Sequence, residues 1–341
     1  MNFKRILSAA TAVCLSITML AGCGSSGGGT ETSAETSAEN GSAKVVNIAI
    51  QPSAAFIPLY IAREKGWIEE ELKDQGITVN WNDFESGPPM NESLAAGSSD
   101  IGVMGDVPTV SAIAAGQNNE VIALAGDGPN SCAFLVKADS DMSSAADLKG
   151  KKVGTVVGST AHNLADKLLK TNDLDINTDV ELVNIAMGDA VAVLSNDEVD
   201  AVIVWEPNIT RLVESGTAKI IGEGSECGFL GLNPIVARAE FAQNNPEIIK
   251  VIIEQYARGA EAMADLDDET TAKIAEILSI EVDQVAKVAE KYDYDVTISE
   301  EDVASLQDTI TFLVKIGVLT EEYEIDDYVK TNYVESAELS K

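Results

Sequence analysis

The sequence D-L-K-G-K-K-V-G-T-V-V-G-S-T-A-H-N runs from Asp147 to Asn163. It predicts a tight turn, a strand at 153–157, a Gly158-Ser159-Thr160 corner and an amphipathic helix that begins at Ala161. A corner of this kind directs unpaired backbone N–H groups and the positive end of a helix dipole at one spot, where small anions bind. Ser159 or Thr160 could equally cap a structural helix, so the segment alone leaves both interpretations open.

Strands and helices alternate on both sides of this segment. Strands are predicted before it at 45–50, 79–84, 101–104 and 121–125, and after it at 180–184 and 201–205. Most of these strands are followed by a polar corner and an amphipathic helix, whereas the chain from Pro246 onward is mainly helical. The alternation predicts an α/β fold with parallel sheets and helices on both faces.

Ligands of open α/β sheets bind beyond the carboxyl ends of the strands, where loops and helix N-termini converge. The loops expected there are Gln51-Pro52-Ser53-Ala54, Ser86-Gly87-Pro88-Pro89, Gly105-Asp106, Gly158 to His162, and Trp205-Glu206-Pro207. The first three belong to the outer part of the chain and the last two to its centre. We therefore expect a site that is shared between two lobes.

The N-terminal residues indicate the compartment. Lys4 and Arg5 precede an apolar run at 6–20 that is too short to span a bilayer as a lasting helix and has the layout of a secretory signal. The run ends in L-A-G-C, which resembles the bacterial lipoprotein signal and implies cleavage before Cys23 and lipid on its sulfur. An ordinary signal peptide that contains a cysteine is the alternative.

The next segment is a predicted tether. Residues 24–43 are mostly Gly, Ser, Thr, Ala and Glu and cannot bury a core. We therefore expect a signal peptide at 1–22, a lipidated Cys23 with a flexible tether at 23–43, and a folded part held at the membrane outside the cytoplasm.

The formal net charge is -33, with 56 acidic and 23 basic residues. This balance excludes nucleic acid as a plausible partner. The acidic residues are spread along predicted helices, as on a solvated surface, and do not by themselves indicate a cation site. None of the candidate loops contains lysine or arginine, so an anionic ligand would depend on backbone dipoles.

Cysteine and histidine usage limits the chemistry. Cys132 and Cys227 are the cysteines of the expected folded part; they could form a disulfide on adjacent strands, or remain as two buried free thiols. A single histidine, His162, leaves no multi-histidine zinc site, and a Ser-His-Asp triad would rest on it alone. There is no phosphate-binding G-x-x-x-x-G-K-[ST] motif, so ATP hydrolysis would belong to a partner. We expect a binding protein without metal or cofactor.

Three segments carry a family resemblance: F-E-S-G-P-P-M-N-E-S-L-A-A-G-S-S-D-I-G-V-M-G-D-V-P at 84–108, the segment from Asp147, and D-E-V-D-A-V-I-V-W-E-P at 197–207. They resemble the aliphatic sulfonate, taurine and nitrate branch of solute-binding proteins that serve ABC importers. The resemblance extends from Val45 to about Ala337 in the family's order.

The resemblance implies a periplasmic-binding-protein fold of type II, in which two α/β lobes are joined by two hinge crossings around a ligand cleft. Residues 44–127 and 233–341 would form lobe 1, and residues 128–232 would form lobe 2. The lobes would close on the ligand, and the closed form, a monomer, would dock on a permease with its own ATPase.

The resemblance also implies where the ligand lies. In sulfonate-binding relatives the anionic head group lies near the corner that matches Ser159-Thr160-Ala161-His162, and the corner at Gln51 resembles that of taurine-binding members. Some relatives have an arginine and an aromatic residue where this chain has Val191 and Val202, which leaves the ligand's identity open. The candidate ligand-binding residues are Gln51, Ser53, Ala54, Ser86, Gly87, Gly105, Asp106, Ser159, Thr160, Ala161, His162, Trp205 and Glu206.

Several candidates have a structural alternative. His162 could cap or pack the helix, and Asp106 could cap the helix that follows it. Trp205 could belong to a core, and Glu206 could accept a ligand's ammonium group or face water. Gly87 would shape its loop together with Pro88, leaving Ser86 as the side chain that donates.

The predicted ligand is a small organic anion, either a sulfonate such as taurine or an alkanesulfonate, or a nitrate-like anion. The alternative ligand is a heteroaromatic such as a thiamine-precursor pyrimidine, for which Trp205, Trp81 and Phe56 would supply the stacking. An enzyme of the thiamine-pyrimidine synthase-like branch is the alternative from another class, but the chain lacks the Cys/His-rich motif of that branch.

Overall fold

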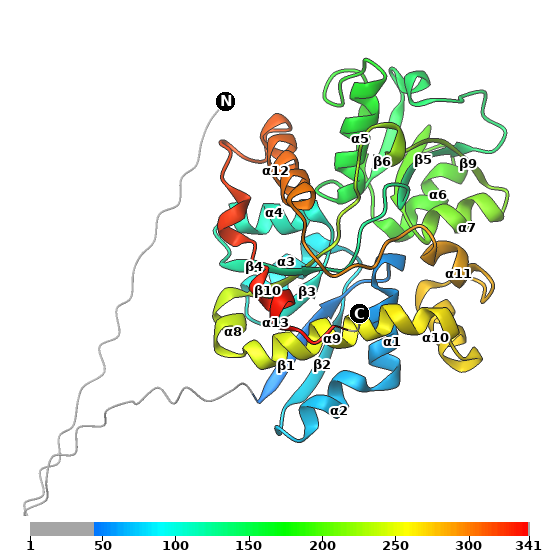
Figure 1. The fold of residues 1–341 in the computed structure, drawn as a ribbon. Coiled ribbons are helices and arrows are strands. Elements are labelled where there is room, and N and C mark those ends of the chain that lie inside the picture. Colours follow the sequence, from blue (N-terminus) through cyan, green and yellow to red (C-terminus); the bar gives the residue numbers. More distant parts are fainter. Residues whose placement is uncertain (1–43, 340–341) are drawn as a thin grey trace, which may run out of the picture. The chain divides into compact units, whose positions relative to one another are not determined.

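A computed structural model describes residues 44–339, so the predicted signal peptide, Cys23 and the tether lie outside the described residues. The described chain forms two five-stranded sheets with helices packed against them (Figure 1). The first sheet has the order β2-β1-β3-β10-β4 and the second the order β7-β6-β8-β5-β9. The strands of the first sheet are β1 (Val45–Ile50), β2 (Thr78–Asp83), β3 (Ile101–Val103), β4 (Asn119–Leu124) and β10 (Pro234–Arg238). Those of the second are β5 (Cys132–Lys137), β6 (Lys152–Thr155), β7 (Glu181–Asn184), β8 (Ala201–Trp205) and β9 (Ala218–Glu223).

Both sheets are mixed, which corrects the expectation of parallel sheets. In the first sheet β1 pairs in parallel with β2 and β3, whereas β10 runs antiparallel to β3 and β4. In the second sheet β6 pairs in parallel with β7 and β8, whereas β5 runs antiparallel to β8 and β9. β5 and β10 are the first strands after the chain crosses from one sheet to the other. They enter without a helical crossover, which is the connection that enforces parallel pairing.

The helices follow the predicted amphipathic segments. Those in the first half of the chain are α1 (Ile57–Lys65), α2 (Trp67–Lys73), α3 (Gly87–Ala95), α4 (Asp106–Ala114) and α5 (Thr160–Thr171). Those in the second half are α6 (Ala190–Ser195), α7 (Asn208–Glu214), α8 (Ala239–Asn244), α9 (Pro246–Ala262), α10 (Asp268–Leu278), α11 (Gln284–Ala289), α12 (Glu300–Lys315) and α13 (Asn332–Ser336). Short 3₁₀ turns include η1 (Ala54–Phe56), which leads into α1.

Each sheet has a hydrophobic core of its own. The buried residues of the second sheet's core all lie between Cys132 and Phe229. The main core of the first sheet takes its residues from before Gly126 and after Asn233, and includes the α9 residues Ile248, Ile252 and Tyr256. A separate cluster joins α12, through Leu306, Ile310 and Leu313, to α4. Separate cores allow the two sheets to move as distinct bodies.

The Cys132–Cys227 disulfide is not formed. Both thiols are free, with Cys132 buried at the start of β5 and Cys227 half-buried. The Cys227 thiol donates to the carbonyl oxygen of Gly224 at 3.4 Å. The alternative of two free thiols therefore describes the structure better, with Cys132 buried and Cys227 partly exposed.

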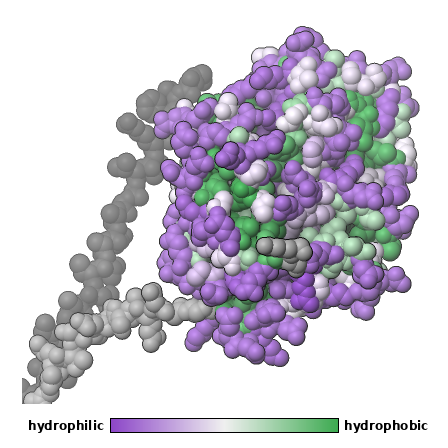
Figure 2. Space-filling model, viewed as in Figure 1, coloured by the Kyte–Doolittle hydropathy of each residue, from purple (hydrophilic) through white to green (hydrophobic). Residues whose placement is uncertain are grey.

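The face shown in Figure 2 is covered mainly by hydrophilic residues, with smaller hydrophobic areas between them. Within residues 44–339, no helix has both the length and the hydropathy that a membrane crossing requires.

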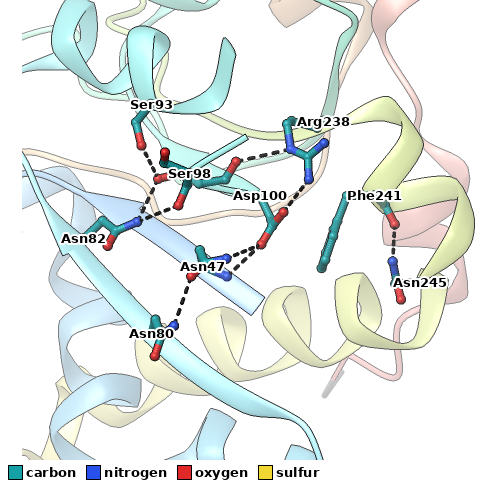
Figure 3. A network of polar contacts seen from close by, with 10 residues as sticks. Asn47, Asn80, Asn82, Ser93, Ser98, Asp100, Arg238, Phe241 and Asn245 are labelled. Carbon is teal, nitrogen blue, oxygen red and sulfur yellow. Dashed lines mark hydrogen bonds and ion pairs between the residues drawn. The ribbon is translucent and has the colours of Figure 1, made fainter. Parts of the chain in front are cut away.

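The buried carboxylate of Asp100 links strands of the first sheet (Figure 3). Asp100 Oδ2 accepts hydrogen bonds from the backbone and side-chain nitrogens of Asn47, at 2.9 and 2.8 Å, which ties it to β1. Asp100 Oδ1 lies 2.5 Å from Nη2 of Arg238, the last residue of β10. Arg238 Nε also donates to the carbonyl oxygen of Ser99 at 3.2 Å. The carboxylate thus joins β1, β3 and the returning strand β10.

Asp100→Ala tests this junction. Removal of a buried carboxylate leaves the Asn47 donors and Arg238 without their acceptor, so we expect the free energy of unfolding to fall by about 3 kcal/mol. The matched control is Asp83→Ala, which breaks the exposed Arg63–Asp83 pair of 2.9 Å and should cost about 0.5 kcal/mol. Chemical denaturation of both variants measures the difference. Equal losses would show that Asp100 has no special role in the sheet.

Candidate functional site

A small cavity lies between the two sheets, at the carboxyl ends of β1, β3 and β8 and the N-termini of α3 and α5. Its volume is about 30 Å³. Its walls are formed by Gln51, Ser53, Gly87, Pro88, Gly105, Pro108, Ser131, Cys132, Ser159, Thr160, Trp205, Gly231, Asn233 and Tyr292. A space this small suits a compact molecule with few heavy atoms.

The structure brings together about half of the residues expected from the sequence. Those that line the cavity are Gln51, Ser53, Gly87, Gly105, Ser159, Thr160 and Trp205. Those that do not line it are Ala54, Ser86, Asp106, Ala161, His162 and Glu206. The side chains of this second group are buried behind the cavity wall.

Sequence reasoning missed the walls made by the crossing segments. Ser131 and Cys132 lie where the chain enters β5, Gly231 and Asn233 lie where it leaves for β10, and Tyr292 follows α11. The glycine-rich and serine-rich composition around both crossings was a usable signal, because it marks segments that approach other backbone closely. In Gly231, φ is +69°, and an added Cβ would meet the Gly128 carbonyl oxygen at 2.4 Å.

The Gly158-Ser159-Thr160 corner has the geometry that its sequence predicts. Gly158 has a φ of +82°, and the Ser159 side chain caps α5 by accepting a hydrogen bond from the His162 N–H at 3.3 Å. The backbone N–H groups of Thr160 and Ala161 donate to no acceptor among the described residues. The N-terminus of this twelve-residue helix therefore has free donors and a positive dipole end at the cavity wall.

Asp106 lies behind the wall and supports it. Its Oδ1 accepts hydrogen bonds from the Thr160 hydroxyl at 2.6 Å and the Val107 N–H at 2.8 Å. Its Oδ2 accepts from the Thr309 hydroxyl at 2.7 Å and the Asn163 amide at 3.3 Å. All these bonds are internal, so the carboxylate is not available to a ligand. It does not cap α4 either, because Gly105 holds the N-cap position and Asp106 is the first helical residue.

His162 is a structural residue. Its Nδ1 accepts a hydrogen bond from the Gly158 N–H at 3.3 Å, and its ring packs edge-on against Phe312 at 5.2 Å. Burial lowers the pKa of His162 to about 4, although the nearby Asp166 carboxylate opposes the shift. The imidazole is therefore neutral at neutral pH and holds the corner from behind.

Glu206 is fully buried and paired. Its Oε1 lies 2.7 Å from Lys291 Nζ and accepts the Thr210 hydroxyl at 3.0 Å, while its Oε2 accepts the Thr210 N–H at 3.1 Å. These contacts occupy the carboxylate, so it neither faces water nor lines the cavity. Lys291 comes from outside the candidate loops, and sequence reasoning did not find it.

Two buried polar atoms in the cavity wall have no hydrogen-bond partner among the described residues: Trp205 Nε1 and Gln51 Oε1. An unpaired buried polar group costs about 1–3 kcal/mol, so such atoms are expected where another molecule completes the bonding. Trp205 Nε1 can only donate, which makes it a partner for an acceptor such as an anionic oxygen.

The wall of the cavity thus consists of neutral groups. Its lining includes no lysine, arginine or carboxylate side chain. Burial raises the pKa of the Cys132 thiol to about 12, so this wall residue is also uncharged at neutral pH. Among residues 44–339 there is also no group of three or more His, Cys, Asp or Glu side chains arranged to hold a metal ion.

Comparison with known proteins gives concordant matches. The model of the family described as NMT1/THI5 like matches residues 53–270. A Bacillus subtilis (strain 168) protein named for aliphatic sulfonate binding is 28% identical over 324 residues, 94% of each chain. The taurine-binding periplasmic protein of Escherichia coli (strain K12) is 30% identical over 213 residues, 61% of this chain and 63% of that protein.

A solved structure shares the fold. The alkanesulfonate-binding protein SsuA from Xanthomonas axonopodis pv. citri, bound to MOPS, matches with a TM-score of 0.78 over 85% of this chain and 99% of that chain, at 21% identity. The predicted periplasmic-binding-protein fold class is therefore confirmed.

The burial of His162 makes stability depend on pH. Because its pKa is about 4 in the folded protein and about 6.5 when exposed, the unfolded state binds more protons between these values. The stabilisation is complete above pH 6.5 and is lost as the pH falls towards 4, by about 3 kcal/mol in all.

The measurement compares chemical denaturation of the wild type and His162→Gln from pH 7 to pH 4. Burial and neighbouring carboxylates raise the pKa of Asp127 to about 6, which acts in the opposite direction. Asp127 is common to both proteins, so the difference between their curves isolates His162. A difference that stays constant across this pH range would contradict the assignment of a neutral buried imidazole.

Proposed function

The chain belongs to the NMT1/THI5-like family, and we propose that it is an extracytoplasmic solute-binding protein of an ABC importer that captures a small organic anion. The favoured ligand is a sulfonate, either taurine or an alkanesulfonate, with a nitrate-like anion as a further member of the same class. The proposal assigns the protein a binding role and no catalytic one. The relatives compared above are binding proteins by name.

The observation that carries the proposal is a set of unpaired neutral donors, of which two belong to residues that line the cavity, Thr160 and Trp205, and one to the adjacent Ala161. The N–H groups of Thr160 and Ala161 and the Nε1 of Trp205 have no partner among the described residues. Sulfonate oxygens are acceptors that remain ionised over the whole physiological pH range, so they match donors that do not titrate. Fixed dipoles in a site with little water can hold such a charge although the net charge of the protein is -33.

Binding is proposed to occur by closure of two lobes, residues 44–127 with 233–341 and residues 128–232. The separate cores of the two sheets and the position of the cavity between them support this division. The protein would act as a monomer that is anchored through lipid on Cys23 and delivers its ligand to a permease with a separate ATPase.

The heteroaromatic alternative has less support. Trp81 donates its Nε1–H to Glu69 at 2.8 Å and Phe56 is buried in the first sheet's core, so neither reaches the cavity. Trp205 and Tyr292 are the aromatic residues in the lining. They could stack on a ring, and a pyrimidine is therefore included in the test.

A ligand panel tests the proposal. Thermal unfolding of the compact part, residues 41–341, is followed with taurine, ethanesulfonate, nitrate and a pyrimidine. A rise of the midpoint with a sulfonate is expected, because a ligand that binds only the folded state stabilises it. No shift with any sulfonate at millimolar concentration would overturn the assignment, and a shift with the pyrimidine alone would establish the alternative.

Trp205→Phe tests the donor directly. The substitution keeps the aromatic bulk and removes the unpaired N–H, so we expect sulfonate affinity to fall about tenfold, as for loss of one hydrogen bond to a charged group. Trp81→Phe is the matched control, since it removes an indole N–H that bonds Glu69 outside the cavity. Calorimetric titration of both variants measures the effect. Unchanged affinity in Trp205→Phe would exclude Nε1 as a ligand contact.

A further inference from the structure

α5 and α12 pack against each other, although they are far apart in the sequence (Figure 1). α5 belongs to the second sheet's core and carries the anion corner at its N-terminus. α12 packs on α4, beside the first sheet. The contact therefore joins the two bodies that the proposed closure would bring together.

The contact is polar at its centre. Asn163 Nδ2 of α5 donates to Thr309 Oγ1 of α12 at 3.1 Å and to Asp106 Oδ2 at 3.3 Å. Thr309 Oγ1 donates in turn to Asp106 Oδ2 at 2.7 Å. Asp106, Asn163 and Thr309 are all nearly inaccessible to solvent. A single buried carboxylate thus joins α4, α5 and α12.

Flanking contacts lie on the same helix faces. Lys315 of α12 lies 2.5 Å from Asp166 of α5, Lys167 of α5 pairs with Asp308, and Phe312 packs on the His162 ring. The Lys167–Asp308 pair is partly exposed and contributes little by itself. The buried Asp106 contacts matter more, because their separation would leave a carboxylate without two of its donors.

The close approach of α4 and α5 also depends on the small size of Gly105. A Cβ added to Gly105 would lie 1.9 Å from Thr160 Oγ1, so the first turns of α4 and α5 meet where only glycine fits. The Thr160 hydroxyl donates to Asp106, which fixes the residue whose N–H group is free at the cavity. The orientation of the anion corner therefore depends on Asp106.

We propose that Asp106 and Thr309 are positioning residues of the binding site, which act through Thr160 and Asn163 to hold the N-terminus of α5 in the ligand-competent arrangement. The proposal rests on the function proposed above. Neither Asp106 nor Thr309 lines the cavity. The bonds of Thr160 and Asn163 to Asp106 and Thr309 cross between the two bodies, so they are broken when the cleft opens and they therefore slow release of the ligand.

Thr309→Val tests the proposal, because it keeps the shape of the side chain and removes the hydroxyl. Thr271→Val is the matched control. The Thr309 and Thr271 hydroxyls both lie within hydrogen-bond distance of the carbonyl four residues earlier in their helix, but of these two only Thr309 also reaches Asp106, which is its nearer acceptor. We expect taurine to dissociate about tenfold faster from Thr309→Val, with little change in its association rate. Thr309→Ser should restore the wild-type rate.

Two readouts separate positioning from a general loss of stability. Stopped-flow kinetics resolve the dissociation and association rates for taurine. Amide hydrogen exchange of residues 159–171, without ligand, should be faster in Thr309→Val than in Thr271→Val. The proposal would be overturned if the dissociation rate of Thr309→Val were unchanged, or if taurine dissociated equally fast from the Thr271→Val control.

A protein that binds no sulfonate would contradict the proposed ligand class and leave the exchange measurement to decide the positioning role. Faster exchange at 159–171 in Thr309→Val alone would then support that role, and equal exchange in all variants would overturn it.

Discussion

The hydrogen bonds accepted by the Asp106 carboxylate are the interactions on which this wall of the cavity depends. The carboxylate is buried, and it accepts all its hydrogen bonds from groups of the protein itself, namely those of Val107, Thr160, Asn163 and Thr309. A buried charge is tolerated only when donors surround it, so the three helices that supply those donors are held at one place. The free amides of α5 follow from this arrangement, because the carboxylate fixes the residue with which the helix begins.

The second constraint is electrostatic. With a net charge of -33, the protein repels anions at long range, and the lining of the cavity contains no basic side chain to offset that repulsion. An anion in this cavity would therefore be held by short-range dipoles and N–H groups, which act only after it has entered. Lys291 forms an ion pair with Glu206, the residue after Trp205 of the cavity wall. The charged pair of Lys291 and Glu206 thus stabilises the fold around the cavity, whereas the residues that line the cavity are uncharged.

Sequence patterns predicted the strands that are followed by helices, such as β6 and β8, and the strand-to-helix corner at Ser159, because these features are local. They did not predict β5, β9 and β10, whose antiparallel pairing depends on where the chain crosses between sheets. The same limit explains why Ser131, Asn233 and Tyr292 were not predicted as residues of the cavity wall. The roles of Asp106 and Glu206 were misjudged because their partners, Thr309 and Lys291, are distant in the chain.

The strand order of the first sheet bears on how the protein is made. β10 lies between β3 and β4, so these two strands do not pair with each other and the sheet is incomplete until residues 234–238 are available. The second sheet draws all its strands from residues 132–223. During synthesis or export from the N-terminus, the central part of the chain is therefore the first that can complete a sheet. The strands β3 and β4 must wait, with unpaired edges, for residues 234–238, which follow the last strand of the second sheet.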